Sequence, residues 1–132
     1  MASPLFLRLL IFVTCAMALF GLTPVVMNQW QGLNACPALG PLPACYLVFV
    51  GYLAVALSVM SKPAYRNWLF YSGWAPVFLL AFSGTAFELS GRVTCPRNTA
   101  DVPMCFYSLT IATGLLVAYL LARRRLPIAA DA

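Results

Sequence analysis

Four of the five cysteines stand in two short loops of the same design. In each loop the first cysteine, Cys36 or Cys95, is followed by proline, and the second, Cys45 or Cys105, has a proline two residues before it. Eight residues separate the first pair and nine the second, and each loop leads into a long apolar run. Thiol pairs of this kind can form structural disulfides, exchange disulfides with another protein or bind a soft metal ion.

The layout of the loops indicates how the cysteines pair. Four cysteines allow three pairings. Because the two loops are parallel in design, we expect the disulfides Cys36–Cys45 and Cys95–Cys105 rather than a link between the loops. Closing a loop of this length stabilises the folded state by about 3 kcal/mol in the chain-entropy account. Structural disulfides are therefore our first interpretation.

A redox interpretation stands beside it. Pro43 and Pro103 suit the first turn of a helix, where a missing N–H costs nothing. Cys45 and Cys105 would then lie in that turn, and the helix dipole favours a thiolate there. Two reactive pairs beside a membrane could pass electrons from soluble thiols to a quinone, which makes ubiquinone the cofactor of this alternative.

The composition indicates a membrane protein. Hydrophobic residues make up 63% of the 132 residues and charged residues only 8%, whereas a soluble domain has about 25% charged residues. The sequence has no histidine, which removes most haem and zinc sites and the commonest general base. The net charge of +5 comes from residues near the ends of apolar runs, so we expect no nucleic-acid binding.

Four apolar runs are long enough to cross a bilayer as helices, which takes about 20 residues. They lack the alternation of barrel strands. We therefore expect an all-α, four-helix membrane bundle in one domain, residues 1–132, divisible into helix-pair repeats at 1–62 and 63–132. The predicted spans are residues 5–26, 42–60, 68–87 and 104–122.

The basic residues give the orientation. Two of them, Arg92 and Arg97, accompany the second cysteine loop, where Glu88 is expected to pair with one or the other. Because Lys and Arg favour the cytoplasmic side, we expect cytoplasmic termini and outer cysteine loops. Residues up to Ala18 also resemble a secretory signal peptide, but we expect a retained span. The expected cytoplasmic anchors are Arg8, Lys62, Arg66, Arg123, Arg124 and Arg125.

Small residues at helical spacing predict close helix packing. Gly114, Ala118 and Ala122 recur every four residues in the fourth run, and Gly51 lies in the second. Such residues let helices approach closely in a membrane. The lone Cys15, inside the first run, is expected to be a small apolar filler, with palmitoylation or a partner contact as alternatives.

The topology resembles that of the disulfide-bond formation protein B family and, in outline, the vitamin K epoxide reductases. The resemblance lies in four spans, inner termini and two outer loops with the pairs Cys36/Cys45 and Cys95/Cys105. It implies quinone-linked thiol oxidation. Those families carry a Cys-x-x-Cys pair, which this chain lacks.

We expect a non-enzymatic role in a larger membrane assembly. The spans have no charged pathway, and the chain shows no catalytic constellation or cofactor motif. An accessory or scaffold subunit in contact with lipid and with partner subunits, or with itself, fits best. Seven arginines against one lysine fit a GC-rich bacterial source, hence an inner membrane with periplasmic loops. A thiol-disulfide oxidoreductase is the alternative, and Cu(I) or Hg(II) handling a remote one.

Overall fold

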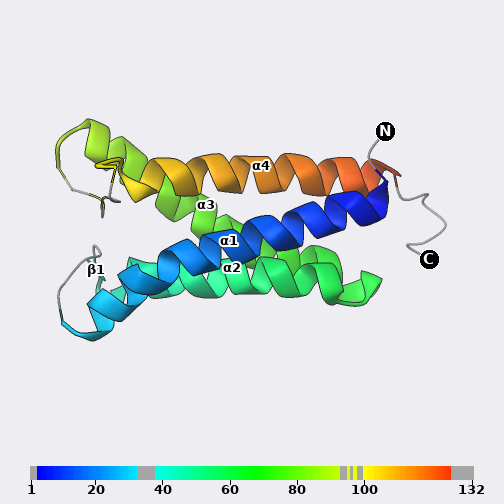
Figure 1. Ribbon diagram of the computed structural model, residues 1–132, viewed down its shortest axis with the longest axis horizontal. Coiled ribbons are helices and arrows are strands. Elements are labelled where there is room, and N and C mark those ends of the chain that lie inside the picture. The colour runs from blue at the N-terminus through cyan, green and yellow to red at the C-terminus, as the bar shows by residue number, and fades with distance from the viewer. Residues whose placement is uncertain (1–2, 33–37, 93–94, 96, 98–99, 126–132) are drawn as a thin grey trace.

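The computed structural model describes residues 3–32, 38–92, 95, 97 and 100–125. Its helices run up and down in a bundle, and a two-stranded hairpin precedes the second helix (Figure 1). The elements are α1 (Pro4–Trp30), β1 (Ala38–Leu39), β2 (Leu42–Pro43), α2 (Ala44–Met60), α3 (Pro63–Leu89) and α4 (Met104–Arg125). The all-α prediction is confirmed for the part of the chain that the structure describes.

In the described part of the chain, three helices are long and apolar enough to cross a membrane. These are the stretches Leu5–Trp30, Pro63–Leu89 and Met104–Arg124. The remaining helix, α2, is apolar but has only 17 residues, which gives it a length of about 25 Å. Three predicted spans therefore coincide with candidate membrane helices, and the predicted span 42–60 coincides with a shorter one.

Proline and serine set the starts of two helices. The side chain of Ser3 caps α1 by accepting a 3.2 Å hydrogen bond from the backbone N–H of Phe6. Pro63 is the first residue of α3, which therefore begins before the predicted start at residue 68. A proline is well tolerated at that position because the N–H it lacks would have no helical partner. Only Ser61 and Lys62 connect α2 to α3, so the two helices are antiparallel neighbours.

Each helix packs against two others. α1 and α3 both lie beside α2 and α4. Cys15 is completely buried in the shared core and has a free thiol, as expected of an apolar filler. The other core residues are Ile11, Tyr52, Val55, Ala56, Phe70, Val77, Ala112, Leu115 and Tyr119.

The outside of the bundle is strongly apolar. Soluble monomers seldom expose continuous apolar surfaces of this kind, and a lipid environment removes the cost of exposing them to water. The surface therefore agrees with a membrane protein. Side chains more than half exposed include Leu5, Phe6, Met17, Phe20, Met60, Leu79, Phe82 and Leu89.

A close helix contact joins α2 and α3 at two glycines. A Cβ on Gly73 would lie 2.7 Å from both the Ala54 Cβ and the Gly51 carbonyl oxygen, and a Cβ on Gly51 would overlap Val77. No side chain fits at either position without moving backbone. Gly51 was predicted to be a packing residue, and Gly73 was not.

The row predicted on α4 requires a correction. Gly114 is exposed, and no described atom lies within 4 Å of the position its Cβ would occupy. Residues four apart rotate by about 40° around a helix at each step, so the row turns away from the core. The buried side of α4 alternates steps of three and four residues. It consists of Ala112, Leu115, Tyr119 and Ala122, with Ala118 partly buried beside it.

Polar and aromatic contacts fix α4 against its neighbours. The Trp74 indole N–H donates a 2.8 Å hydrogen bond to the Ala112 carbonyl, and Phe70 stacks on Tyr119 with ring centroids 3.8 Å apart. The Tyr52 and Ser108 hydroxyls lie 2.9 Å apart and link α2 to α4. These hydrogen bonds are partly buried between helices, where they help define the register of the bundle.

We expect Trp74→Phe to lower the free energy of unfolding by about 1 kcal/mol, because it removes one interhelical hydrogen bond and part of a ring. The matched control is Trp68→Phe, since Trp68 is 72% exposed, and it should have almost no effect. Unfolding by sodium dodecyl sulfate in mixed micelles measures both. Equal effects of the two variants would contradict a specific role for Trp74.

Candidate functional site

The two cysteine loops lie at the same end of the bundle (Figure 1). Each loop contains a backbone pairing between equivalent positions. In the first loop (residues 36–45), Ala38 pairs with Pro43. In the second loop (residues 95–105), Arg97 pairs with Pro103 in an antiparallel bridge. In both loops, the residue two after the first cysteine thus pairs with the residue two before the second cysteine. The repeated sequence pattern has a repeated structure.

Both loops also contain a left-handed residue between the paired positions. Gly40 has φ +65° and Asp101 has φ +60°. Glycine adopts this conformation freely, and aspartate does so more readily than most other residues. The backbone carbonyl of Asp101 accepts a 3.0 Å hydrogen bond from Arg97, which helps hold the second loop in this turn.

Pro43 and Pro103 stand directly before the helices rather than inside their first turns. Pro43 is the N-cap of α2, and Pro103 precedes Met104, the first residue of α4. Cys45 and Cys105 are consequently the second residues of α2 and α4. The expected place of these cysteines in the first turn is correct, whereas that of the prolines is one residue off.

The end of α3 directs the chain into the second loop. Gly91 has φ +73°, its N–H bonds to the Glu88 carbonyl at 3.1 Å, and the Arg92 N–H bonds to the Phe87 carbonyl at 3.0 Å. This pair of bonds is the Schellman motif, in which glycine takes the left-handed position that ends the helix. The turn reverses the chain, so that Cys95 lies beside the last turns of α3.

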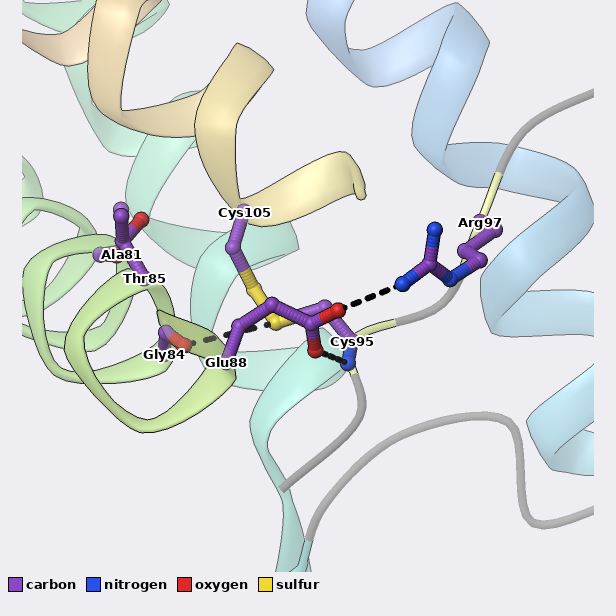
Figure 2. The surroundings of a disulfide bond; sticks show 7 residues. All are labelled: Ala81, Gly84, Thr85, Glu88, Cys95, Arg97 and Cys105. Carbon is purple, nitrogen blue, oxygen red and sulfur yellow. Dashed lines mark hydrogen bonds and ion pairs between the residues drawn. A yellow bond between two sulfur atoms is a disulfide. The ribbon is translucent and has the colours of Figure 1, made fainter. Parts of the chain in front are cut away.

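The second-loop disulfide joins Cys95 to Cys105 and packs onto α3 (Figure 2). Cys95 is only 3% exposed. A Cβ on Gly84 would lie 2.8 Å from the Cys105 sulfur and 3.5 Å from the Cys95 sulfur, so the absence of a side chain at Gly84 makes room for the disulfide. The Cys95 sulfur is 3.8 Å from the Gly84 carbonyl oxygen, a packing contact, since a disulfide sulfur has no hydrogen to donate.

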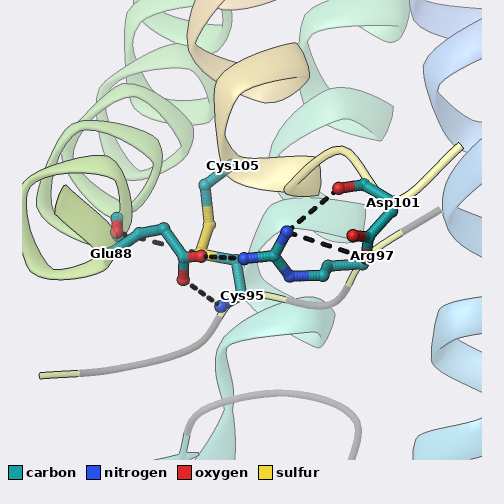
Figure 3. A network of polar contacts seen from close by, with 6 residues as sticks. Glu88, Cys95, Arg97, Asp101 and Cys105 are labelled. Carbon is teal, nitrogen blue, oxygen red and sulfur yellow. Dashed lines mark hydrogen bonds and ion pairs between the residues drawn. A yellow bond between two sulfur atoms is a disulfide. The ribbon is translucent and has the colours of Figure 1, made fainter. Parts of the chain in front are cut away.

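Glu88, one turn beyond Gly84, ties the same loop to the helix (Figure 3). One carboxylate oxygen accepts a 2.8 Å hydrogen bond from the Cys95 backbone N–H. The other accepts a 2.7 Å hydrogen bond from the Arg97 guanidinium, which also lies 3.7 Å from the Asp101 carboxylate. The Glu88 side chain is 10% exposed, against 44% for Arg97. Of the two expected partners, Arg92 and Arg97, the Glu88 carboxylate pairs with Arg97.

These contacts make Glu88 a fixed point of the loop. Charge-assisted hydrogen bonds to a largely buried carboxylate are stronger than neutral ones, and losing one partner leaves the other without compensation. The backbone of Cys95, the disulfide and the Arg97 side chain thus all attach to one face of α3, made by Gly84 and Glu88. The arrangement holds the sulfurs in place.

We expect Glu88→Gln to lower the free energy of unfolding by about 1.5 kcal/mol, because the amide can accept from only one of the two donors. The matched control is Asp101→Asn, which removes the other carboxylate near Arg97. Asp101 is 86% exposed, so this change should cost less than about 0.5 kcal/mol. Denaturation in mixed micelles measures both, and similar losses would contradict the role given to Glu88.

The first loop is described only in part. Cys45 is 7% exposed and disulfide-bonded. Its expected partner, Cys36, lies outside the described residues, so the pairing Cys36–Cys45 stays a prediction. Because Cys45 and Cys105 occupy the same place in their helices, the two loops present equivalent second cysteines.

The sequence also raised the alternatives of a soft-metal site and a quinone site. Within the described ranges, no three His, Cys, Asp or Glu residues gather closely enough to hold a metal ion. We consider two pockets in this part of the chain. One lies on the outer side of α1, around Phe12 and Phe20, and the other at the end of the bundle opposite the loops. Neither is lined by Cys95 or Cys105.

The predicted cytoplasmic anchors gather at that opposite end. Lys62 is the N-cap of α3, and Arg66 follows in its first turns, half-buried. Arg123 and Arg124 are exposed near the end of α4, and Arg125 is its last residue. The helix order therefore brings the basic residues of distant sequence segments to one end of the bundle.

Gly84 and Glu88 were not identified as site residues from the sequence. Their spacing of four residues puts them on one helix face, which was a usable signal. The sequence did not show that Cys95 returns to that face, because this return depends on the turn at Gly91.

Comparison with known protein families, curated proteins and solved structures finds no match to this chain.

Proposed function

We propose that this chain is a four-span protein of a bacterial inner membrane, with both termini in the cytoplasm and both cysteine loops in the periplasm. The collection of basic residues at the end opposite the loops supports this orientation, since Lys and Arg favour the cytoplasmic side. A disulfide in the second loop agrees with an oxidising compartment.

The fourth span in this proposal is α2. Its 17 residues are at the lower end of the range that crosses a bilayer. Support comes from its connections, because it starts beside the first cysteine loop and ends two residues before α3. The close contact with α3 at Gly51 and Gly73 keeps α2 at the same depth.

Within that membrane we propose an accessory or scaffold role in a larger assembly. The single observation that carries this proposal is the packing of the second-loop disulfide against Gly84, together with the attachment of its loop to Glu88. A reactive disulfide must be reached by a partner thiol, whereas Cys95 is 3% exposed and Cys105 is partly buried. The disulfide is better suited to keeping the outer surface of the bundle rigid for a partner.

Isolation from native membranes in mild detergent, followed by native mass spectrometry, tests this role. We expect a complex of fixed stoichiometry, with a second protein or with further copies of the chain, in which the cysteines stay oxidised. The double variant Cys95→Ser/Cys105→Ser should weaken the complex, and Asp101→Asn should leave it intact. A chain found only as a monomer in every mild detergent would contradict the proposal.

A quinone-linked thiol-disulfide oxidoreductase is the second candidate. The observation in its favour is the position of Cys105 in the first turn of α4, where the helix dipole stabilises a thiolate leaving group. In this candidate Cys45 and Cys105 react, with Cys36 and Cys95 as their partners and ubiquinone as acceptor. The resemblance to the disulfide-bond formation protein B family stays a prediction, as does soft-metal handling.

A further inference from the structure

The end of the bundle opposite the cysteine loops contains a small cavity lined by arginines from three helices. Arg8 comes from α1, Arg66 from α3 and Arg123 from α4. Arg8 and Arg66 are half-buried, and the Arg66 guanidinium donates a 3.3 Å hydrogen bond to the Ser61 carbonyl. Figure 1 shows that the start of α1 and the end of α4 lie at the same end of the bundle.

Three of the residues that line this cavity are arginines, and none of the described acidic residues lines it. Both described acidic residues, Glu88 and Asp101, belong to the end with the cysteine loops. An anion that enters the cavity therefore meets positive side chains from three directions. Arginine suits such a site, because its planar fork can bind two oxygens of a phosphate group at once.

The remaining lining combines polar and apolar groups. The Asn67 side-chain oxygen accepts a hydrogen bond from the Tyr119 hydroxyl, so an anion that contacts Asn67 would meet the amide nitrogen, a donor. Ile11, Val59 and Ala122 form apolar walls. The volume of about 30 Å³ exceeds what one water requires and suits the tip of a small anionic group.

We propose that this cavity binds the phosphate group of an anionic membrane lipid. Basic pockets between membrane helices on the cytoplasmic side are suited to anionic head groups. This inference rests on the membrane orientation proposed above. It goes beyond that proposal by assigning a ligand class and three binding residues.

The test uses the full-length, delipidated protein in a neutral detergent. Native mass spectrometry follows the binding of phosphatidylglycerol, with phosphatidylcholine as the zwitterionic reference. We expect one phosphatidylglycerol per chain at an affinity at least about tenfold above that of phosphatidylcholine, a difference of about 1.4 kcal/mol. Arg66→Gln and Arg123→Gln should each reduce the phosphatidylglycerol affinity by about tenfold.

The matched control is Arg124→Gln, which removes the same charge next to Arg123 from a residue that does not line the cavity. It should change the affinity less than twofold. Equal losses for Arg124→Gln and Arg123→Gln would overturn the site, because they would indicate general charge attraction. Arg123 is exposed near the helix end, so its variant keeps the test valid even if Arg66→Gln fails to fold.

Competition by inorganic phosphate distinguishes a lipid phosphate group from a free phosphate ion as the ligand of the cavity. If it fails to displace phosphatidylglycerol at millimolar concentration, the lipid is the ligand. If it displaces the lipid completely, the cavity binds a soluble phosphate and the lipid proposal fails.

Extraction of native membranes with carbonate tests the proposed membrane function independently of the lipid site. A chain that washes off the membrane overturns the proposed membrane function, whatever the detergent experiment gives.

Discussion

Replacement of both Cys95 and Cys105 by serine is expected to lower the free energy of unfolding by about 3 kcal/mol. The disulfide closes a short loop, so its loss returns conformational freedom to the unfolded chain. The change also removes the packing of two sulfurs against Gly84. Sodium dodecyl sulfate titration in mixed micelles, followed by circular dichroism, measures the loss.

Two controls separate the covalent bond from the side chains. The double alanine variant removes the serine hydroxyls and should lose a similar amount of stability, because the bond is absent in both. Under reducing conditions the wild type and the variants should have nearly the same midpoint, because reduction removes the Cys45 disulfide from all of them. A loss of less than about 0.5 kcal/mol in the variants would mean that the disulfide does not stabilise the fold.

Gly73→Ala is expected to destabilise the bundle by about 2 kcal/mol. The added methyl would lie 2.7 Å from the Ala54 Cβ and from the Gly51 carbonyl oxygen, so α2 and α3 must move apart. The helix preference of alanine offsets part of this cost, by at most about 1 kcal/mol. The same denaturation experiment measures the net loss.

Gly114→Ala is the matched control for that change. It makes the same substitution inside a helix, but at an exposed position with no described atom within 4 Å of the new methyl. Its stability should stay the same or rise by up to about 1 kcal/mol. If Gly114→Ala destabilised the monomeric chain as much as Gly73→Ala, the assigned contact between α2 and α3 would be wrong.

The elements were largely readable from the sequence. Apolar runs predicted the helices because burial in lipid or in a core demands length and hydrophobicity, and both can be counted along the chain. The early start of α3 was readable too, since Pro63 directly after Lys62 is a helix-start signal. Arginines at the run ends indicated which ends belong together.

The contacts between helices were less predictable. Gly73 and Gly114 look alike in the sequence, yet one touches a neighbouring backbone and the other faces outward. Apolar residues surround the helices on all sides, so no periodicity distinguishes the core from the lipid-facing surface. The choice depends on how helices are rotated, which is a property of the whole bundle.

The site was predictable to an intermediate degree. The Cys95–Cys105 pair and the place of Cys45 and Cys105 in the first helical turn followed from local rules. The packing of the disulfide on Gly84 and the bond from Cys95 to Glu88 did not, because they join residues through a turn whose direction depends on Gly91. Local spacing in the sequence predicted the cysteines of the site but not the residues that surround them.

Thiol oxidation with ubiquinone tests the central claim most directly, namely that the cysteine loops serve structure rather than electron transfer. The purified, oxidised protein is mixed with a thioredoxin-like dithiol, with and without ubiquinone, while dithiol oxidation is followed. We predict no ubiquinone-dependent turnover and a Cys95–Cys105 bond that stays oxidised in the folded state. Sustained ubiquinone-dependent turnover that Cys45→Ser or Cys105→Ser abolishes would contradict the account.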